Sequence, residues 1–247
     1  MNISSYITYF EKACSSSDLI HECYSENSEE FTSILVNDQT NGRGRFGRKW
    51  LSTRGNLHFS TLVKPKLNIK YWPQLSFVIS LAVRSALYCY IKKTYKINFK
   101  WPNDIFFKNK KISGILIETT NDQRALVVGV GINLISNPDK GNSYWESTNL
   151  YDLFKVKILT NEISILLLEE IQKYIKIWYD NGFSYIKELW IENALFLNDD
   201  LYSIDLKKNF TGKFVDIDEF GQIILKDNKG NLTKFSSGTF LPTKLMV

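Results

Sequence analysis

The chain has 247 residues, of which 44% are hydrophobic and 23% are charged, and its formal net charge is +5. This length and composition predict a substantial hydrophobic core, shared between one medium-sized domain and a small one. A positive balance this small suits an anionic ligand or an acidic protein partner, and it is weaker than that of a typical nucleic-acid-binding protein.

Few residues of the chain are suited to metal binding or to histidine-based catalysis. The chain has two histidines, and its three cysteines lack C-x-x-C spacing, which argues against zinc and favours a reducing compartment. Residues 1–17 are mixed and polar, unlike a signal peptide, and polar side chains interrupt the longest apolar run, residues 77–87. We therefore expect a cytoplasmic protein without a membrane span.

The first part of the chain predicts both helices and strands. Residues 4–13 have the pattern of a short amphipathic helix, and residues 28–31 have the turn and N-cap character of another helix start. Residues 34–36 and 56–63 are typical of strands. Residues 71–93 place apolar side chains at helical spacing along one wide face, which predicts a core helix.

Strands dominate the middle of the chain. The patterns predict strands over residues 97–100, 105–107, 111–119 and 125–134. Asn109-Lys110 is the expected turn of one hairpin, and Asn121-Asp122-Gln123 is the expected turn of the next.

Two helices and a group of short strands follow. Helical periodicity returns over residues 160–179, and a second helix over residues 183–193 follows Gly182. From Leu195 the pattern changes to short alternating strands, which suggest a small barrel or sandwich. The strands are expected at residues 201–206, 210–217, 222–226 and 232–236.

Residues 42–50, GRGRFGRKW, combine three glycines with four cations and end on a tryptophan. Glycine lets backbone N–H groups approach an anion, arginine matches carboxylate and phosphate oxygens, and tryptophan offers a flat face to a ring. The segment therefore suits a planar anion such as a nucleotide. Because the four cations repel one another, we expect this loop to be mobile until an anion binds.

The same letters match the G-x-G-x-x-G dinucleotide fingerprint, but their context does not. No helical pattern follows the loop, the acidic residue expected about 20 positions later is missing, and no G-x-x-x-x-G-K-[ST] P-loop occurs. A solvated basic hairpin or a nucleic-acid-binding patch remains the alternative on local grounds.

Three further segments carry a more specific pattern. They are Lys100-Trp101-Pro102-Asn103-Asp104, KISGILIE at residues 111–118 and VGVGINL at residues 128–134. Together with residues 42–50, in this order and spacing, they resemble the catalytic domain of biotin protein ligases. That family's pattern runs G-R-G-R-x-G-R-x-W, K-W-P-N-D, K-x-x-G-I-L-x-E and G-x-G-I-N. The resemblance extends from about residue 25 to the C-terminus.

The resemblance implies an α+β fold with two parts. A mixed β-sheet catalytic domain backed by helices is expected over residues 1–194, and a small C-terminal SH3-like β-barrel over residues 195–247. Many bacterial members carry an N-terminal winged helix-turn-helix that makes them biotin-sensing repressors. Here 24 residues precede Ser25-Glu26-Asn27, a segment similar to the family's S-T-N, and this is too few for a DNA-binding domain. The expectation is the monofunctional class.

The resemblance also implies a reaction and its residues. Biotin and ATP would form biotinyl-5'-AMP, and the biotinyl group would pass to a lysine of a biotin carboxyl carrier protein. The implied catalytic residues are Lys111, Arg45 and Asp104. The implied biotin-binding residues are Ser25, Asn27, Gln39, Gly42, Arg43, Gly44, Arg45, Lys111 and Gly114. The implied ATP-binding residues are Arg45, Arg48, Trp50, Asn103, Lys111 and Asn133.

Other expectations concern metals and partners. Magnesium is implied only with ATP, since the sequence contains no visible cluster of metal ligands. Specific DNA binding and membrane association are not expected, and a homodimer remains open. Glu26 stands where the family usually has threonine, so it is given no role.

Alternatives remain for single residues and for the whole chain. Asp104 also fits a turn cap, and Asn133 also fits a buried residue that holds a strand end. A lipoate–protein ligase-like acyl-adenylating enzyme is one alternative function. Biotin is preferred because Gln39 and Ser25 suit a ureido group and because of the exact sequence of the loop at residues 42–50. The other alternative function is a non-catalytic biotin-binding module, and the presence of Lys111 and Arg45 is evidence against it.

Overall fold

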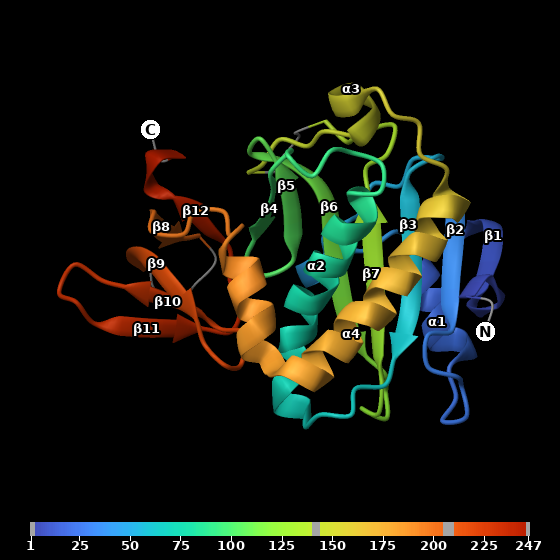
Figure 1. Cartoon of the computed structure of the whole chain (residues 1–247), viewed down its shortest axis with the longest axis horizontal. Helices are drawn as coiled ribbons and strands as arrows, with labels where there is room; N and C mark the ends of the chain where they lie inside the picture. The colour runs from blue at the N-terminus through green and yellow to red at the C-terminus, as the bar shows by residue number, and fades with distance from the viewer. Residues whose placement is uncertain (1–2, 140–143, 205–209, 246–247) are drawn as a thin grey trace.

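The computed structural model describes residues 3–139, 144–204 and 210–245, and its strands form two sheets. The larger sheet has seven strands in the order β1-β2-β3-β7-β6-β5-β4 (Figure 1). Its strands are β1 (Ile7–Ala13), β2 (Ser33–Gln39), β3 (Leu57–Val63), β4 (Ile97–Lys100), β5 (Asp104–Phe107), β6 (Lys110–Thr119) and β7 (Leu126–Ile132). Strands β1 and β2 are parallel and the other neighbours are antiparallel, so the sheet is mixed.

Helices cover both faces of the larger sheet. The α-helices are α1 (Ser16–Cys23), α2 (Leu75–Leu87), α3 (Leu150–Phe154) and α4 (Thr160–Ile191), and the 3-10 turns are η1 (Ile3–Tyr6), η2 (Arg45–Gly47), η3 (Ile69–Gln74) and η4 (Thr243–Leu245). Helices α2 and α4 pack on one face, where Leu35 and Phe59 join the main core. Helix α1 packs on the other face, where Val36 and Leu62 belong to a small second core. This confirms the expected α+β fold.

The N-terminal region differs from its sequence pattern. Residues 4–13, expected as a helix, form η1 and then the edge strand β1. Ile7, Thr8, Tyr9 and Phe10 are β-branched or aromatic and favour a strand once β2 offers a hydrogen-bonding edge. Residues 28–31 form a turn and not a helix start. Helix α1 was not predicted, although Ser15 caps it by accepting hydrogen bonds from Ser17 N and Asp18 N.

The central elements follow the prediction with small shifts. The predicted helix over residues 71–93 corresponds to η3, which contains Pro73, followed by α2, which ends at Leu87. The turn between β5 and β6 lies at Lys108 and Asn109, one residue earlier than expected. Both residues have positive φ, 47° and 62°, as a two-residue hairpin turn requires.

Helix α4 is interrupted where the sequence predicted a break. Gly182 has a φ of 75°, and the helix resumes beyond it. The second part carries Trp190, whose ring stacks on Phe99 of β4 at 5.7 Å and meets Phe77 of α2 edge-on at 5.0 Å. Trp190 thereby joins the helical layer to the sheet. Within the described ranges, the helices lack the combination of length and hydrophobicity that a membrane crossing requires.

The smaller sheet has five antiparallel strands in the order β11-β10-β9-β8-β12. They are β8 (Asp200–Ser203), β9 (Thr211–Ile217), β10 (Ile223–Lys226), β11 (Leu232–Phe235) and β12 (Phe240–Pro242). Four of the five were predicted, and β12 was missed because Phe240-Leu241-Pro242 is too short to alternate. Residues 205 and 206 of the first predicted strand lie outside the described residues, and the domain boundary at residue 195 stays a prediction.

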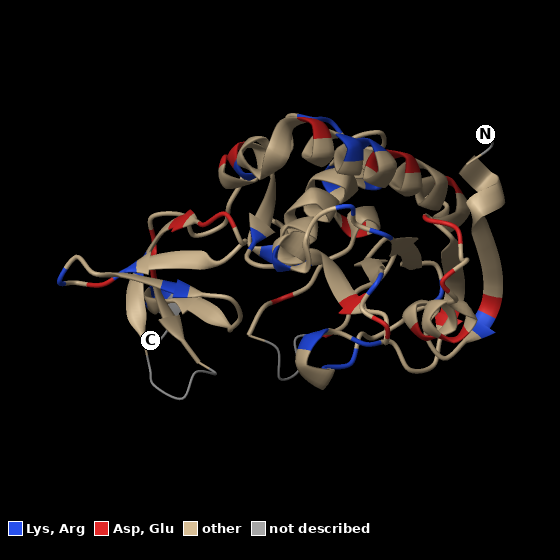
Figure 2. Cartoon of the chain, turned by 90° about the horizontal axis from the view of Figure 1, so that it is seen from below, with Lys and Arg blue, Asp and Glu red and all other residues tan. Residues whose placement is uncertain are grey.

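The smaller sheet lies beside the β4–β5 end of the larger one, whereas β1 lies at the opposite end (Figures 1 and 2). Trp101 is central to the contact, because its Nε1 donates to Gly221 O at 2.9 Å and its ring lies 5.9 Å from that of Phe240. Gln74 Nε2 donates to Glu219 O nearby. The segment after β4 therefore contacts the C-terminal sheet directly.

Trp190→Ala is expected to lower the free energy of unfolding by about 3–5 kcal/mol, because it leaves a large cavity between α4, α2 and the sheet. Tyr185→Ala is the matched control, since Tyr185 lies on the same helix with an exposed side chain, and it should change stability by less than about 0.5 kcal/mol. Chemical denaturation measures both. Equal effects of the two variants would contradict this account of the core.

Candidate active site

A cavity of about 690 Å³ opens on the α1 side of the larger sheet. Its floor is formed by β3, β6 and β7. Its walls are the N-terminus of α1, the loop of residues 42–50 and the KWPND segment at residues 100–104, with Gly238 and Thr239 at the margin. The sequence motifs, which are far apart along the chain, thus meet around one space.

Glycines make the floor of the cavity flat. Gly114 on β6 and Gly131 on β7 are cross-strand neighbours, and the indole of Trp50 lies against both. A Cβ at Gly131 would come within 2.4 Å of the Trp50 ring, and one at Gly114 would lie 3.0 Å from it. Any side chain at Gly131 would therefore displace the indole. The glycines of these two motifs therefore allow the Trp50 indole to pack closely against the sheet.

The loop of residues 42–50 is a short hairpin. Gly44 N donates to Arg48 O at 2.7 Å, and Trp50 N donates to Gly42 O at 2.9 Å. Gly42 does not line the cavity, but a Cβ there would lie 2.6 Å from Trp50 O, so glycine is needed for the hairpin to close. Trp50 Nε1 is buried and has no hydrogen-bond partner among the described residues.

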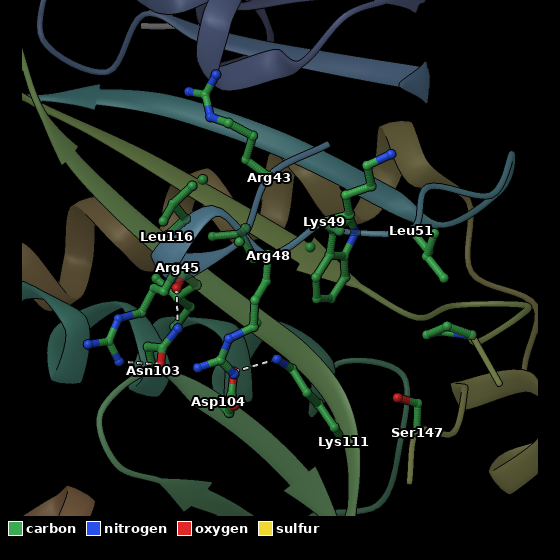
Figure 3. A pocket seen from close by; sticks show the side chains of 18 of the residues that line it. Arg43, Arg45, Arg48, Lys49, Leu51, Asn103, Asp104, Lys111, Leu116 and Ser147 are labelled. Carbon is green, nitrogen blue, oxygen red and sulfur yellow. Dashed lines mark hydrogen bonds and ion pairs between the residues drawn. The ribbon is translucent and has the colours of Figure 1, made fainter. Parts of the chain in front are cut away.

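The charged end of the cavity centres on Asp104. Lys111 Nζ lies 2.6 Å from Asp104 Oδ1 (Figure 3). Lys100 is the direct cross-strand neighbour of Asp104 in the β4–β5 pair. Burial alone would raise the pKa of the Asp104 carboxyl, but Lys111 and Lys100 outweigh it and hold this pKa below its usual value. Asp104 is therefore ionised at neutral pH.

Lys100, which was not predicted as a site residue, is a buried cation. It is 7% exposed, and its Nζ lies 3.5 Å from Trp101 O and 5.4 Å from the ring centre of Trp145. Burial lowers the pKa of Lys100 to about 8, although Asp104 acts in the opposite direction. Burial is the main cause of this low pKa, and the nearby cations Lys111, Arg45 and Arg48 lower it further.

Two loop arginines point toward the same end. Arg45 Nη1 donates to Asn103 Oδ1 at 3.2 Å, and Asn103 Nδ2 donates to Ile115 O on β6. Arg48 Nη2 donates to Thr239 Oγ1, just before β12, at 3.1 Å. In Figure 3 both guanidinium groups lie near Asn103 and Asp104. The loop thus brings its charges to the cations of β4 and β6.

Arg43 points the other way. Its guanidinium pairs with Asp18 of α1 and, at 3.0 Å, with Glu118 of β6, and Figure 3 shows it directed away from Arg45 and Arg48. The pairing attaches the first half of the loop to the α1 side of the sheet. A role for Arg43 in contacting biotin stays a prediction.

The opposite end of the cavity is polar and uncharged. Gln39 Oε1 accepts from Ser16 N at 2.8 Å, and Gln39 Nε2 donates to Ser52 Oγ. The hydroxyls of Ser16 and Ser17 both contact that of Ser60 on β3, at 2.8 and 3.0 Å. Such a network of amides and hydroxyls can exchange partners with a neutral ligand that both donates and accepts.

Ser25 and Asn27 lie elsewhere. Both are exposed in the turn after α1 and are not among the described residues that line the cavity. The N-terminus of α1 brings Ser16 and Ser17 to the place where Ser25 was expected. A Ser-Ser-Ser-Asp run ahead of a short amphipathic segment is an N-cap signal, and it could have identified these serines.

The remaining predicted residues line the cavity. Asn133, just after β7, donates through Nδ2 to Thr148 O at 3.0 Å, whereas its Oδ1 is buried without a hydrogen-bond partner among the described residues. The cavity is lined by the predicted residues Gln39, Arg43, Gly44, Arg45, Arg48, Trp50, Asn103, Asp104, Lys111, Gly114 and Asn133. The described residues include no group of three or more His, Cys, Asp or Glu side chains suited to a metal ion.

Two family models match the chain. Residues 15–134 match the biotin/lipoate A/B protein ligase family, and residues 204–241 match the biotin protein ligase C-terminal domain. The bifunctional ligase/repressor BirA of Bacillus subtilis is 30% identical over 233 residues, which cover 91% of this chain and 70% of that protein. The biotin–[acetyl-CoA-carboxylase] ligase of Paracoccus denitrificans is 29% identical, with 80% of this chain and 85% of that protein covered.

The fold has a similar solved structure. A biotin protein ligase from Aquifex aeolicus, solved in complex with biotin and ATP, superposes with a TM-score of 0.81 at 29% identity. The superposition covers 95% of this chain and 97% of that one. Both sheets therefore have counterparts in one solved protein.

The depressed pKa of Lys100 predicts a pH-dependent affinity for anions. Lys100 is charged at pH 7 and loses its proton as the pH rises through about 8, so its attraction for an anion disappears by pH 9.5. Calorimetry with pyrophosphate should show wild type binding about tenfold more tightly than Lys100→Met at pH 7, with the difference vanishing at pH 9.5. A difference that is constant with pH would contradict the assignment.

Proposed function

The chain belongs to the biotin protein ligase family and is a ligase, and we propose that it activates biotin with ATP and transfers it to a lysine of a biotin carboxyl carrier protein. The observation that carries the proposal is the shape of the cavity. An uncharged polar end at Gln39 and a cationic end at Lys111 belong to one cavity, which suits a ligand with a neutral ring and an anionic tail.

The first half-reaction joins two anions. A carboxylate oxygen of biotin attacks the α-phosphorus of ATP, a new O–P bond forms, and the bond to the β-phosphate breaks to release pyrophosphate. Negative charge gathers around the phosphorus, so fixed cations stabilise the transition state. Lys111 and Arg45 supply this charge, and Asp104 and Asn103 hold them in place. Magnesium enters with ATP as part of the substrate.

The second half-reaction consumes the adenylate. The amine of the carrier lysine attacks the biotinyl carbonyl, an amide bond forms, the bond to the phosphate oxygen breaks, and AMP leaves while the amine loses a proton. Asp104 is ionised and half-buried at the same end of the cavity, so it can accept the proton that the carrier lysine loses. This gives Asp104 a part in both steps.

The binding residues divide between the two ends. We assign biotin to Gln39, Gly44 and Gly114, with Ser16 and Ser17 in place of Ser25 and Asn27, because only the former pair lines the cavity. ATP is assigned to Arg45, Arg48, Trp50, Asn103 and Asn133, with the indole as the stacking surface for adenine. Gly42 contributes by closing the hairpin.

The proposal extends to partners and location. Described residues 3–23 form η1, β1 and α1, which belong to the catalytic sheet and its cover, so we propose no sequence-specific DNA binding by the described part of the chain. Cys14, Cys23 and Cys89 are free and exposed, which suits a reducing, cytoplasmic environment. A homodimer stays a prediction.

Purified protein, ATP and a carrier domain, incubated with biotin or with lipoate, test the proposed function. Mass spectrometry should show one biotinyl group on one carrier lysine, and none without ATP. Lipoate has no ureido group to use the polar end, so it should give little product. Lipoylation in place of biotinylation would support the acyl-adenylating alternative, and biotin binding without a mass gain would support a non-catalytic module.

Lys111→Ala should slow biotinyl-adenylate formation at least about 100-fold, because a fixed cation at the reacting phosphate is lost. Transfer from chemically prepared biotinyl-adenylate should fall much less. Lys110→Ala is the matched control, since Lys110 is exposed and pairs with Glu146, and its rates should match those of wild type. Equal losses in both half-reactions would show that Lys111 acts in general binding or folding.

Biotin and ATP together should slow hydrogen exchange at residues 45–47, because the ligand anions neutralise the repulsion between the loop cations. The amides of Gly44 and Trp50 already donate hydrogen bonds within the hairpin and should change less, which provides an internal control. Exchange at residues 45–47 that is unchanged by the ligands would contradict the expectation of a loop ordered by anions.

A further inference from the structure

His58 is a buried histidine on the floor of the cavity that neither the sequence motifs nor the proposed chemistry uses. It lies on β3 and is 2% exposed, yet it is one of the lining residues. The neighbouring side chains Leu57 and Phe59 belong to the main core. Because side chains alternate along a strand, His58 lies on the opposite face, as does Ser60, which contacts the α1 serines.

One nitrogen of the ring is fixed by the backbone. His58 Nδ1 lies 3.2 Å from Val36 O, and a carbonyl oxygen can only accept, so Nδ1 carries the proton and donates. Burial lowers the pKa of His58, so the ring is neutral at pH 7. A neutral imidazole with its proton on Nδ1 leaves Nε2 as an acceptor. This atom is buried and has no hydrogen-bond partner among the described residues.

The position of His58 relates it to both ends of the cavity. Its cross-strand neighbour on β7 is Gly131, which lies under the Trp50 indole. Two residues further along β3, about 7 Å away, Ser60 belongs to the network of Ser16, Ser17 and Gln39. His58 thus lies on the same face of β3 as this polar network, and its Nε2 is a buried lone pair without a donor, which is unfavourable.

We propose that His58 is a specificity residue whose Nε2 accepts a hydrogen bond from a ureido N–H of biotin, an inference that rests on the proposed function. The ureido ring offers two N–H donors and one carbonyl. Gln39 Oε1 already accepts from Ser16 N, whereas His58 Nε2 is an acceptor without a hydrogen-bond partner among the described residues and is available for a second N–H. The dithiolane ring of lipoate has no N–H, so this acceptor favours biotin. The amino group of adenine is the other ligand donor that could bind His58 Nε2, so the test also measures the KM for ATP.

The test measures biotin-dependent ATP–pyrophosphate exchange. His58→Phe should raise the KM for biotin about tenfold, because a buried hydrogen bond is lost, while kcat and the KM for ATP change little. His58→Gln, which keeps an acceptor, should restore much of the affinity. His21→Phe is the matched control, because His21 lies outside the cavity lining, and it should behave as wild type. Should His58→Phe not fold, as judged by thermal unfolding, His58→Ala takes its place.

Biotins methylated singly on each ureido nitrogen identify the bond. In wild type, methylation of the nitrogen that faces His58 should weaken binding about tenfold, and in His58→Phe this penalty should disappear. A penalty that persists in the variant, or a biotin KM unchanged by His58→Phe, would overturn the inference. The inference would also be overturned if His58→Phe raised the KM for ATP but not the KM for N6-methyl-ATP, because His58 would then contact the amino group of adenine. Absence of biotin-dependent exchange in wild type would instead refute the proposed function, so the two failures are distinguishable.

Discussion

The arrangement of the site depends on an excess of positive charge around a single ion pair. Asp104 and Lys111 are held 2.6 Å apart on adjacent strands, and Lys100, Arg45 and Arg48 add further cations at the same end of the cavity. Burial is the main cause of the low pKa of Lys100, about 8, and the neighbouring cations lower this pKa further. In the proposed reaction an anionic ligand neutralises part of this positive charge, and the fixed cations lie where we propose that negative charge develops.

The fold supplies what this charge cluster needs. Strand pairing sets Lys100 beside Asp104 and Gly114 beside Gly131, so the sheet places the cations and the flat floor in a fixed register. The loop adds Arg45 and Trp50, and α1 adds the serines at the uncharged end. The C-terminal sheet reaches the same cavity, since Arg48 donates to Thr239. The contact of Trp101 with Gly221 and Phe240 joins that sheet to the KWPND segment, and this gives the C-terminal sheet a direct connection to the site.

Local sequence patterns predicted most of the sheet and drew attention to residues 42–50, including Trp50. Lys111 and Asn103 were found through the ordered motifs that resemble the biotin protein ligase pattern. Strand β1 was missed, because its stability comes from pairing with β2. Ser25 was chosen on a three-letter match, whereas the serines that line the cavity are set by the N-cap of α1. The ion pairs of Arg43, the burial of Lys100 and the free nitrogen of His58 depend on residues distant in sequence, and no local pattern reports them.

A crystal structure with a non-hydrolysable biotinyl-adenylate analogue tests the central claim most directly. The account predicts that the phosphate analogue lies within hydrogen-bonding distance of Lys111 Nζ and the Arg45 guanidinium, with the bicyclic ring at the end formed by Gln39 and Ser16. The N-terminus of α1, with Ser15 to Ser17, lies at the opposite, uncharged end of the cavity. A phosphate bound there, with the ring at the lysines, would contradict the account.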